Sequence, residues 1–115
     1  MIAVIFEVWP KPEHRGQYFD MAAALRPHLA DVDGFLSVER FESLTEPGKL
    51  LSLSVWRDEA ALAEWRRLGE HRTAQGIGRN AFFKDYRLRV TEVQRDYGMS
   101  ERAQAPADSR AIHDR

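Results

Sequence analysis

Residues 53–83, LSVWRDEAALAEWRRLGEHRTAQGIGRNAFF, carry the densest structural signals in the chain. Alternating residues lead up to Trp56 and predict a strand, and Asp58 is suited to cap the helix that follows. On this helix, expected over residues 59–72, the apolar residues share one face: Ala61, Leu62, Trp65, Leu68 and Gly69. Two glycines then end the helical pattern ahead of a new strand.

Around this stretch, apolar periodicity predicts the remaining elements. Residues 2–9, IAVIFEVW, predict a buried strand, and residues 13–30 predict an amphipathic helix. Residues 35–44 and 49–57 predict two strands paired as a hairpin around the turn TEPG, and residues 84–95 predict a last strand. The order β-α-β-β-α-β indicates an α+β, ferredoxin-like fold in which both helices cover one face of a four-stranded antiparallel sheet.

Length and composition limit the class of protein. A chain of 115 residues with 43% hydrophobic residues supports one domain, which we place at residues 1–97, followed by a flexible polar tail at residues 98–115. Seventeen Lys and Arg residues nearly balance eighteen Asp and Glu residues, which argues against nucleic-acid and membrane partners. The absence of cysteine excludes disulfides and thiolate chemistry, and the short apolar N-terminal run without a basic leader favours a cytoplasmic location.

The face of the sheet turned away from the helices is expected to be apolar as well. The first strand has large hydrophobic residues on both sides, and the third strand has them on one side. Exposing such a face in a monomer costs roughly 25 cal/mol per Å². A second copy of the same face is the simplest cover, so we expect a C2 homodimer with the two sheets packed together.

The candidate functional residues gather in the same stretch that decides the fold. Trp56, Trp65 and Phe82 predict aromatic walls for a flat small-molecule ligand, beside His71 as a titratable group. Arginine suits a carboxylate or a phenolate, and four arginines lie close in sequence: Arg66, Arg67, Arg72 and Arg79. The alternatives are an exposed or capping His71, tryptophans that only build the core, and arginines on a solvated helix face.

Glu7 is a charge flanked by hydrophobic residues on the first strand. A carboxylate there needs a partner, such as an arginine of the last strand, or must line a wet cavity. If it were buried without a partner, its pKa would rise and it could act as a base. No pair of histidines or carboxylates has convincing metal-ligand spacing, so we expect no metal site.

Taken together, the chain resembles the antibiotic biosynthesis monooxygenase family, small proteins of the dimeric α+β-barrel superfamily. The resemblance covers roughly residues 1–97 and rests on IAVIFEVWPKPEHRGQYFD, DVDGFLSVERFES, LSVWRDEAALAEWR and the histidine that follows. The family includes cofactor-independent oxygenases that oxidise polycyclic phenols to quinones, and proteins that degrade haem. The resemblance therefore implies one of these two activities. The chain departs from the haem-degrading pattern, because Glu7 stands where those members have an asparagine and His71 follows Trp65 by only six residues.

Three functions are therefore expected. The first is a cofactor-independent monooxygenase that oxidises a planar phenolic or quinol-type molecule in a pocket between sheet and helices. Its residues would be a base, His71 or Glu7, and a binding set: Trp56, Trp65, Phe82, Arg72 and Arg79. The second is a haem-binding or haem-degrading protein with His71 as axial ligand, and the third is a non-catalytic dimeric module that binds a small ligand.

Overall fold

The computed structural model of the chain describes residues 1–75 and 82–114, and the side chains of residues 69–75 lie outside that description. The main elements, in chain order, are β1 (Ile2–Pro10), α1 (Arg15–Ala30), β2 (Phe35–Glu42), β3 (Leu50–Trp56), α2 (Glu59–Gln75) and β4 (Phe83–Glu92). The strands form one sheet in the order β2-β3-β1-β4, and every neighbouring pair is antiparallel. The predicted ferredoxin-like arrangement is confirmed.

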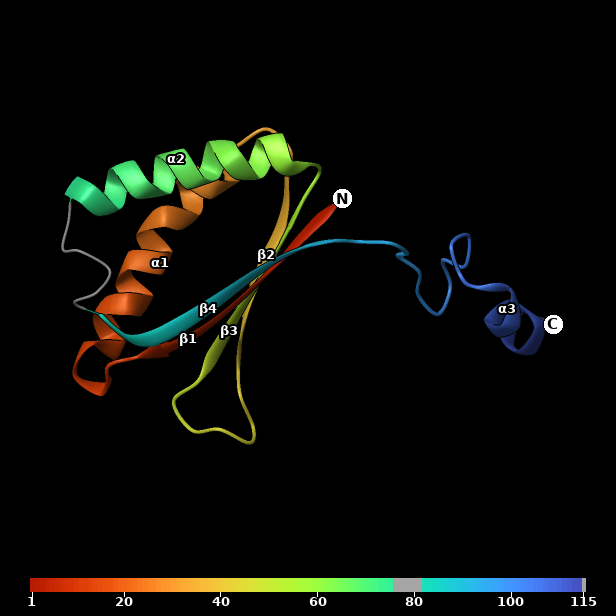
Figure 1. The fold of residues 1–115 in the computed structure, drawn as a ribbon, viewed down its shortest axis with the longest axis horizontal. Helices are drawn as coiled ribbons and strands as arrows, with labels where there is room; N and C mark the ends of the chain where they lie inside the picture. The colour runs from red at the N-terminus through yellow and green to blue at the C-terminus, as the bar shows by residue number, and fades with distance from the viewer. Residues whose placement is uncertain (76–81, 115) are drawn as a thin grey trace.

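Both helices lie on the same side of the sheet (Figure 1). Alternation along β1 turns Ile2, Val4 and Val8 toward the helices, and all three are buried. Two clusters of buried side chains hold the layers together. The first contains Ile2, Val4, Leu29, Val32, Trp56 and Ala61, and the second contains Val8, Tyr18 and Leu50.

The start of α2 is fixed by a cap and an ion pair. Asp58 accepts a hydrogen bond at Oδ1 from the backbone N–H of Ala61 at 2.9 Å, which confirms the predicted N-cap. This bond, assisted by the neighbouring Arg57 guanidinium, holds the pKa of the Asp58 carboxyl below its usual value. Arg57 also pairs with Asp33 at 3.2 Å, and its backbone N–H donates to the Gly34 carbonyl at 2.7 Å. The α2 helix is thereby tied to the turn that precedes β2.

The other face of the sheet carries no helix among the described elements (Figure 1). The strand register places a patch of aliphatic residues there, in the cross-strand rows Ile5–Leu53 and Ala3–Val55, next to Leu51 and Phe41. Phe41 is 43% exposed. We call these six residues the open-face patch. The structure thus shows the apolar second face that the sequence predicted.

The C-terminal segment leaves the sheet and projects away from it (Figure 1). The radius of gyration is 17.0 Å, whereas a compact chain of this length has about 13 Å. The sequence predicted no regular structure here, but the segment contains a short helix, α3 (Ala107–His113). Arg102 organises it by donating to the Gly98 carbonyl, Ser109 Oγ and Asp114. The flexibility of this tail stays a prediction.

Candidate functional site

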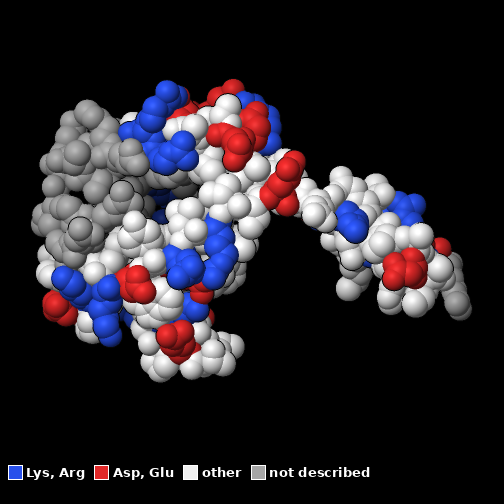
Figure 2. All heavy atoms as spheres, in the orientation of Figure 1, with Lys and Arg blue, Asp and Glu red and all other residues white. Residues whose placement is uncertain are grey.

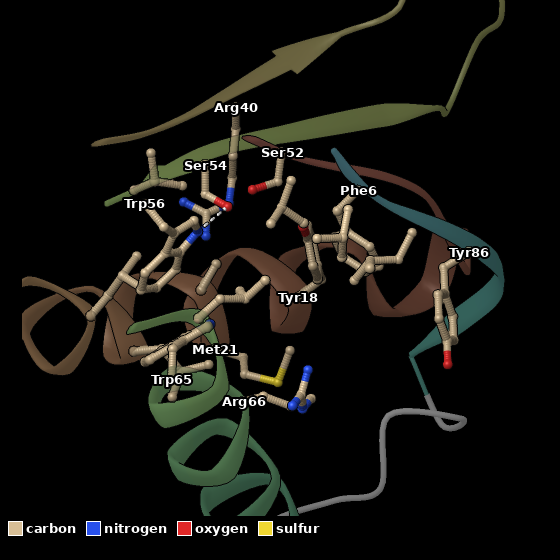
Figure 3. A pocket seen from close by; sticks show the side chains of 18 of the residues that line it. Phe6, Tyr18, Met21, Arg40, Ser52, Ser54, Trp56, Trp65, Arg66 and Tyr86 are labelled. Carbon is tan, nitrogen blue, oxygen red and sulfur yellow. Dashed lines mark hydrogen bonds between the residues drawn. The ribbon is translucent and has the colours of Figure 1, made fainter. Parts of the chain in front are cut away.

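A pocket of about 330 Å³ lies between the helix-covered face of the sheet and the two helices. Every strand and both helices contribute to it, and its walls are mainly aliphatic and aromatic (Figure 3). The volume lies at the lower end of the range for small-molecule sites, roughly 300–1,000 Å³. In the space-filling view, Lys and Arg atoms are visible at a hollow beneath α2 (Figure 2).

Two tryptophans form one end of the pocket (Figure 3). Trp56 ends β3 and is only 1% exposed, because alternation along the strand turns it inward. Its indole Nε1–H donates to Ser54 Oγ at 2.9 Å, so the buried donor is satisfied. Trp65 comes from α2 and stacks on Trp56 with ring centroids 6.4 Å apart and an interplanar angle of 28°. The sequence alternatives of core and pocket wall therefore both hold for this pair.

A second aromatic group lines the part of the pocket near β4. Phe6 contacts Phe83 and Tyr86 at centroid distances of 6.2 and 5.7 Å, and Tyr18 contacts Phe83 at 5.6 Å. The inward residues of β4 are covered by no helix among the described elements: Tyr86 is 40% exposed, Leu88 51% and Val90 44%. This wall is therefore open to solvent and accessible to a ligand.

Two arginines bring positive charge into this apolar space. Arg40 enters from β2 and extends past Ser52 and Ser54, and Arg66 enters from α2 (Figure 3). The described lining includes both guanidinium groups and no carboxylate. An apolar, aromatic pocket with two cations can bind a flat molecule and stabilise a negative charge on it.

Glu7 lies on the opposite face of the sheet and does not line this pocket. Its carboxylate pairs with Lys49 Nζ at 2.5 Å and with Arg89, so the predicted pairing with an arginine of the last strand is confirmed. The hydrogen bond from Lys49, followed by that from Arg89, lowers the pKa of Glu7, and the bond to Glu7 raises the pKa of Lys49. Glu7 therefore belongs to an ion pair that lies outside the pocket.

The remaining predicted site residues divide into two groups. Phe82 is buried against His14 with ring centroids 5.9 Å apart, and its neighbour Phe83 takes the place in the pocket wall. His71 and Arg72 belong to α2, but their side chains lie outside the described part of the structure. Arg79 lies outside the described residues.

Sequence reasoning missed several lining residues, among them Tyr18, Met21 and Arg40. Arg40 had a usable signal: alternation places it on the face of Val38, which packs against the core, so a charge there needs a polar cavity. In the described residues no group of three or more potential metal ligands comes together. No described helix combines the length and apolarity that a membrane span requires.

Comparisons with known proteins agree with this architecture. The family model described as antibiotic biosynthesis monooxygenase matches residues 1–76. A protein of Pyricularia oryzae named jasmonate monooxygenase ABM is 48% identical over 93 residues, which cover 81% of this chain and 43% of that protein. The chain thus spans less than half the length of that relative.

Solved structures share the fold at low sequence identity. Rv0793 from Mycobacterium tuberculosis superimposes with a TM-score of 0.72 at 20% identity, over 84% of this chain and 98% of that one. A variant of SnoaB, a cofactor-independent oxygenase from Streptomyces nogalater, gives a TM-score of 0.66 at 12% identity, over 83% and 94% of the two chains. With the family match covering most of the sheet and both helices, the chain belongs to the antibiotic biosynthesis monooxygenase family.

Proposed function

We propose that this protein is a monooxygenase that oxidises a small, planar molecule of the phenol or quinol type in the pocket between sheet and helices. One observation carries the proposal: stacked and edge-on aromatic rings surround a pocket that contains two arginines and, among its described lining residues, no carboxylate. Such a lining favours a flat apolar ring and the anion formed when that ring loses a proton. The names of the relatives, a jasmonate monooxygenase and a cofactor-independent oxygenase, support oxygen chemistry.

The reaction requires no external electrons when the substrate is a phenol. Deprotonation gives an electron-rich phenolate that reacts with O₂. One oxygen atom enters the ring, and the two hydrogens lost in forming the quinone leave with the second oxygen atom as water. The protein has to remove a proton, hold the anion and exclude water. We assign removal of the proton to His71 of α2 and binding of the anion to an arginine of the pocket. The walls formed by Trp56 and Trp65 would hold the ring.

The haem alternative would use the same residue, His71, as axial ligand. The chain departs from the haem-degrading pattern at Glu7 and in the spacing between Trp65 and His71. Addition of haemin to the purified protein tests this directly. A Soret shift that disappears in His71→Ala would favour haem binding over the proposed reaction.

Oxygen uptake with a panel of polycyclic phenols tests the proposed function. We expect His71→Ala to lower turnover by about 10²-fold or more, because general-base catalysis contributes on that scale. His113→Ala is the matched control, since His113 is exposed at the end of α3. Equal turnover by His71→Ala and the wild type would rule out the assigned base, and no uptake with any phenol would rule out the reaction.

We also propose that the active form is a homodimer joined through the open-face patch. Ile5, Leu53 and Val55 of this patch have no helix to cover them among the described elements, and burying them against a second copy removes apolar area from water. Light scattering should give a dimer for the wild type and for Leu44→Asp, a change at a fully exposed turn residue. Leu53→Asp should give a monomer. A monomeric wild type at micromolar concentration would exclude this assembly.

A further inference from the structure

Arg40 is the most unusual group in the pocket. Its side chain points inward from β2, and its Nε atom is buried without a hydrogen-bond partner. No ion pair or hydrogen bond to Arg40 exists within the part of the chain that the structure describes. Elsewhere on the same sheet, Arg89 of β4 is paired with a carboxylate. Arg40 therefore has one buried N–H donor without an acceptor, and no counter-charge among the described residues.

Such an arrangement is unfavourable for folding alone. Removing a guanidinium donor from water without giving it an acceptor costs free energy, and buried arginines are normally paired. An acceptor that arrives with a ligand would recover this cost at the moment of binding. The unpaired donor therefore indicates a negatively charged ligand group at this position.

The sheet around Arg40 is graded from polar to apolar. One cross-strand row on the helix-covered face runs from Arg40 on β2 through Ser52 on β3 and Phe6 on β1 to Leu88 on β4. At about 4.8 Å between strands, the row spans roughly 14 Å. A ligand lying across the strands therefore meets hydrogen-bond donors at one end and hydrocarbon at the other.

Ser54 strengthens the polar end. Its Oγ accepts the Trp56 indole N–H, so its own hydroxyl proton remains to be donated to another acceptor. Arg40, Ser54 and Trp56 all line the pocket (Figure 3). A planar fork and a hydroxyl donor match the two oxygens of a carboxylate better than the single oxygen of a phenolate.

We propose that the substrate carries a carboxylate that is bound by Arg40, while the oxidisable ring lies toward Phe6 and the β4 wall. This inference rests on the proposed function, because it concerns the same pocket, and it narrows the substrate class from phenols in general to aromatic hydroxy acids. Arg40 binds and orients the substrate, and the redox step is the one given above.

Binding calorimetry with a hydroxynaphthoic acid, its methyl ester and plain naphthol tests the inference independently of turnover. We expect the wild type to bind the acid roughly 10- to 100-fold more tightly than the ester, the range expected for charge-assisted hydrogen bonds. Arg40→Met should lose this preference while it still binds the ester and naphthol. Arg40→Lys should keep part of the preference for the acid, because the positive charge remains but the planar guanidinium with its paired N–H donors is lost.

Arg26→Met is the matched control, since Arg26 is exposed on α1 and does not line the pocket. It should bind all three compounds like the wild type. A wild type that binds acid and ester equally, or an Arg40→Met variant that keeps the preference, overturns the carboxylate assignment and leaves the phenol pocket standing. A wild type that binds none of the three overturns both proposals.

Urea unfolding supplies a second readout. Because Arg40 is unpaired without ligand, Arg40→Met should have a midpoint no lower than that of the wild type. A clearly lower midpoint would mean that Arg40 serves the fold, and it would overturn the premise of the inference.

Discussion

The hydrogen bond between Trp56 and Ser54 gives a sharp test of how the pocket wall is held. In Ser54→Ala the indole Nε1–H of Trp56, a side chain only 1% exposed, loses its acceptor. A buried donor left without a partner costs about 1–3 kcal/mol. We expect a loss of about 1.5 kcal/mol in the free energy of unfolding, or a fall of roughly 6 °C in the melting temperature.

Ser52→Ala is the control for this prediction. Ser52 lies two residues away on the same strand and faces the same pocket, and no hydrogen bond of its side chain is present among the described residues. Its removal should change stability by less than about 0.5 kcal/mol. Urea unfolding, followed by circular dichroism, measures both variants.

A double-mutant cycle separates the hydrogen bond from other effects of the serine. In a Trp56→Phe background there is no indole donor, so Ser54→Ala should cost about 0.5 kcal/mol or less. The coupling energy between the two positions should then be about 1 kcal/mol. Equal losses for Ser54→Ala and Ser52→Ala, or a coupling energy near zero, would refute the reasoning.

Three further predictions concern the frame around the site. Because pairing lowers the pKa of Glu7 below 4.5, Glu7 stabilises the fold above pH 4.5, and this contribution disappears as the pH falls through the lower pKa of the folded state. In urea unfolding, Glu7→Gln should therefore be less stable than the wild type at neutral pH, and the difference should shrink on acidification. A difference that stays constant with pH would contradict this. Asp58→Ala should lower the free energy of unfolding in urea by about 1 kcal/mol, because the cap of α2 is lost. Asp58→Asn should keep most of this stability, because asparagine can also cap a helix. Equal losses in the two variants would mean that the cap is not responsible. Gly34 has φ 92°, and a Cβ there would lie 2.7 Å from the Cβ of Ala61, so Gly34→Ala should lower the free energy of unfolding, measured by thermal denaturation, by about 1–3 kcal/mol. A Cβ at Gly16 of α1 would meet open space, so Gly16→Ala should not lower it.

The elements could be predicted because their signals are local. Alternation gave the β2–β3 hairpin, helical periodicity gave α1 and α2, and a single residue, Asp58, marked the start of α2 correctly. The stacked pair of Trp56 and Trp65 follows from the same patterns, since each residue lies on the inward face of its own element. Packing then brings the two inward faces together.

The misassigned aromatic residue shows where local patterns stop. Phe83 and Tyr86 are three residues apart, so simple alternation would place them on opposite faces of β4. The pairing of β1 with β4 shifts between Trp9 and Pro10, and both aromatic side chains line the pocket, with ring centroids 6.0 Å apart. An irregularity of one residue reverses every later side chain, and it depends on a partner strand distant in sequence.

Long-range pairing also decides what each charge does. Glu7 and Arg40 are both charged residues on strands, but their environments differ because adjacent strands present different partners. Lys49 directly precedes β3 and Arg89 lies on β4, and both pair with Glu7, so the charge of Glu7 is neutralised within the fold. Arg40 faces Ser52 across the ladder and finds no carboxylate among the described pocket residues.

The two proposed roles, ligand binding and assembly, therefore fall on opposite faces of the sheet, at adjacent residues of one strand. On β2, Arg40 points into the pocket, whereas its neighbours Glu39 and Phe41 lie on the other face with the open-face patch. A substitution at Arg40 should alter ligand preference without altering assembly, and one at Phe41 should do the reverse. Because adjacent positions on one strand share backbone and register, a strand-wide disturbance would change both properties together. Separate responses would show that each face acts through its own side chains.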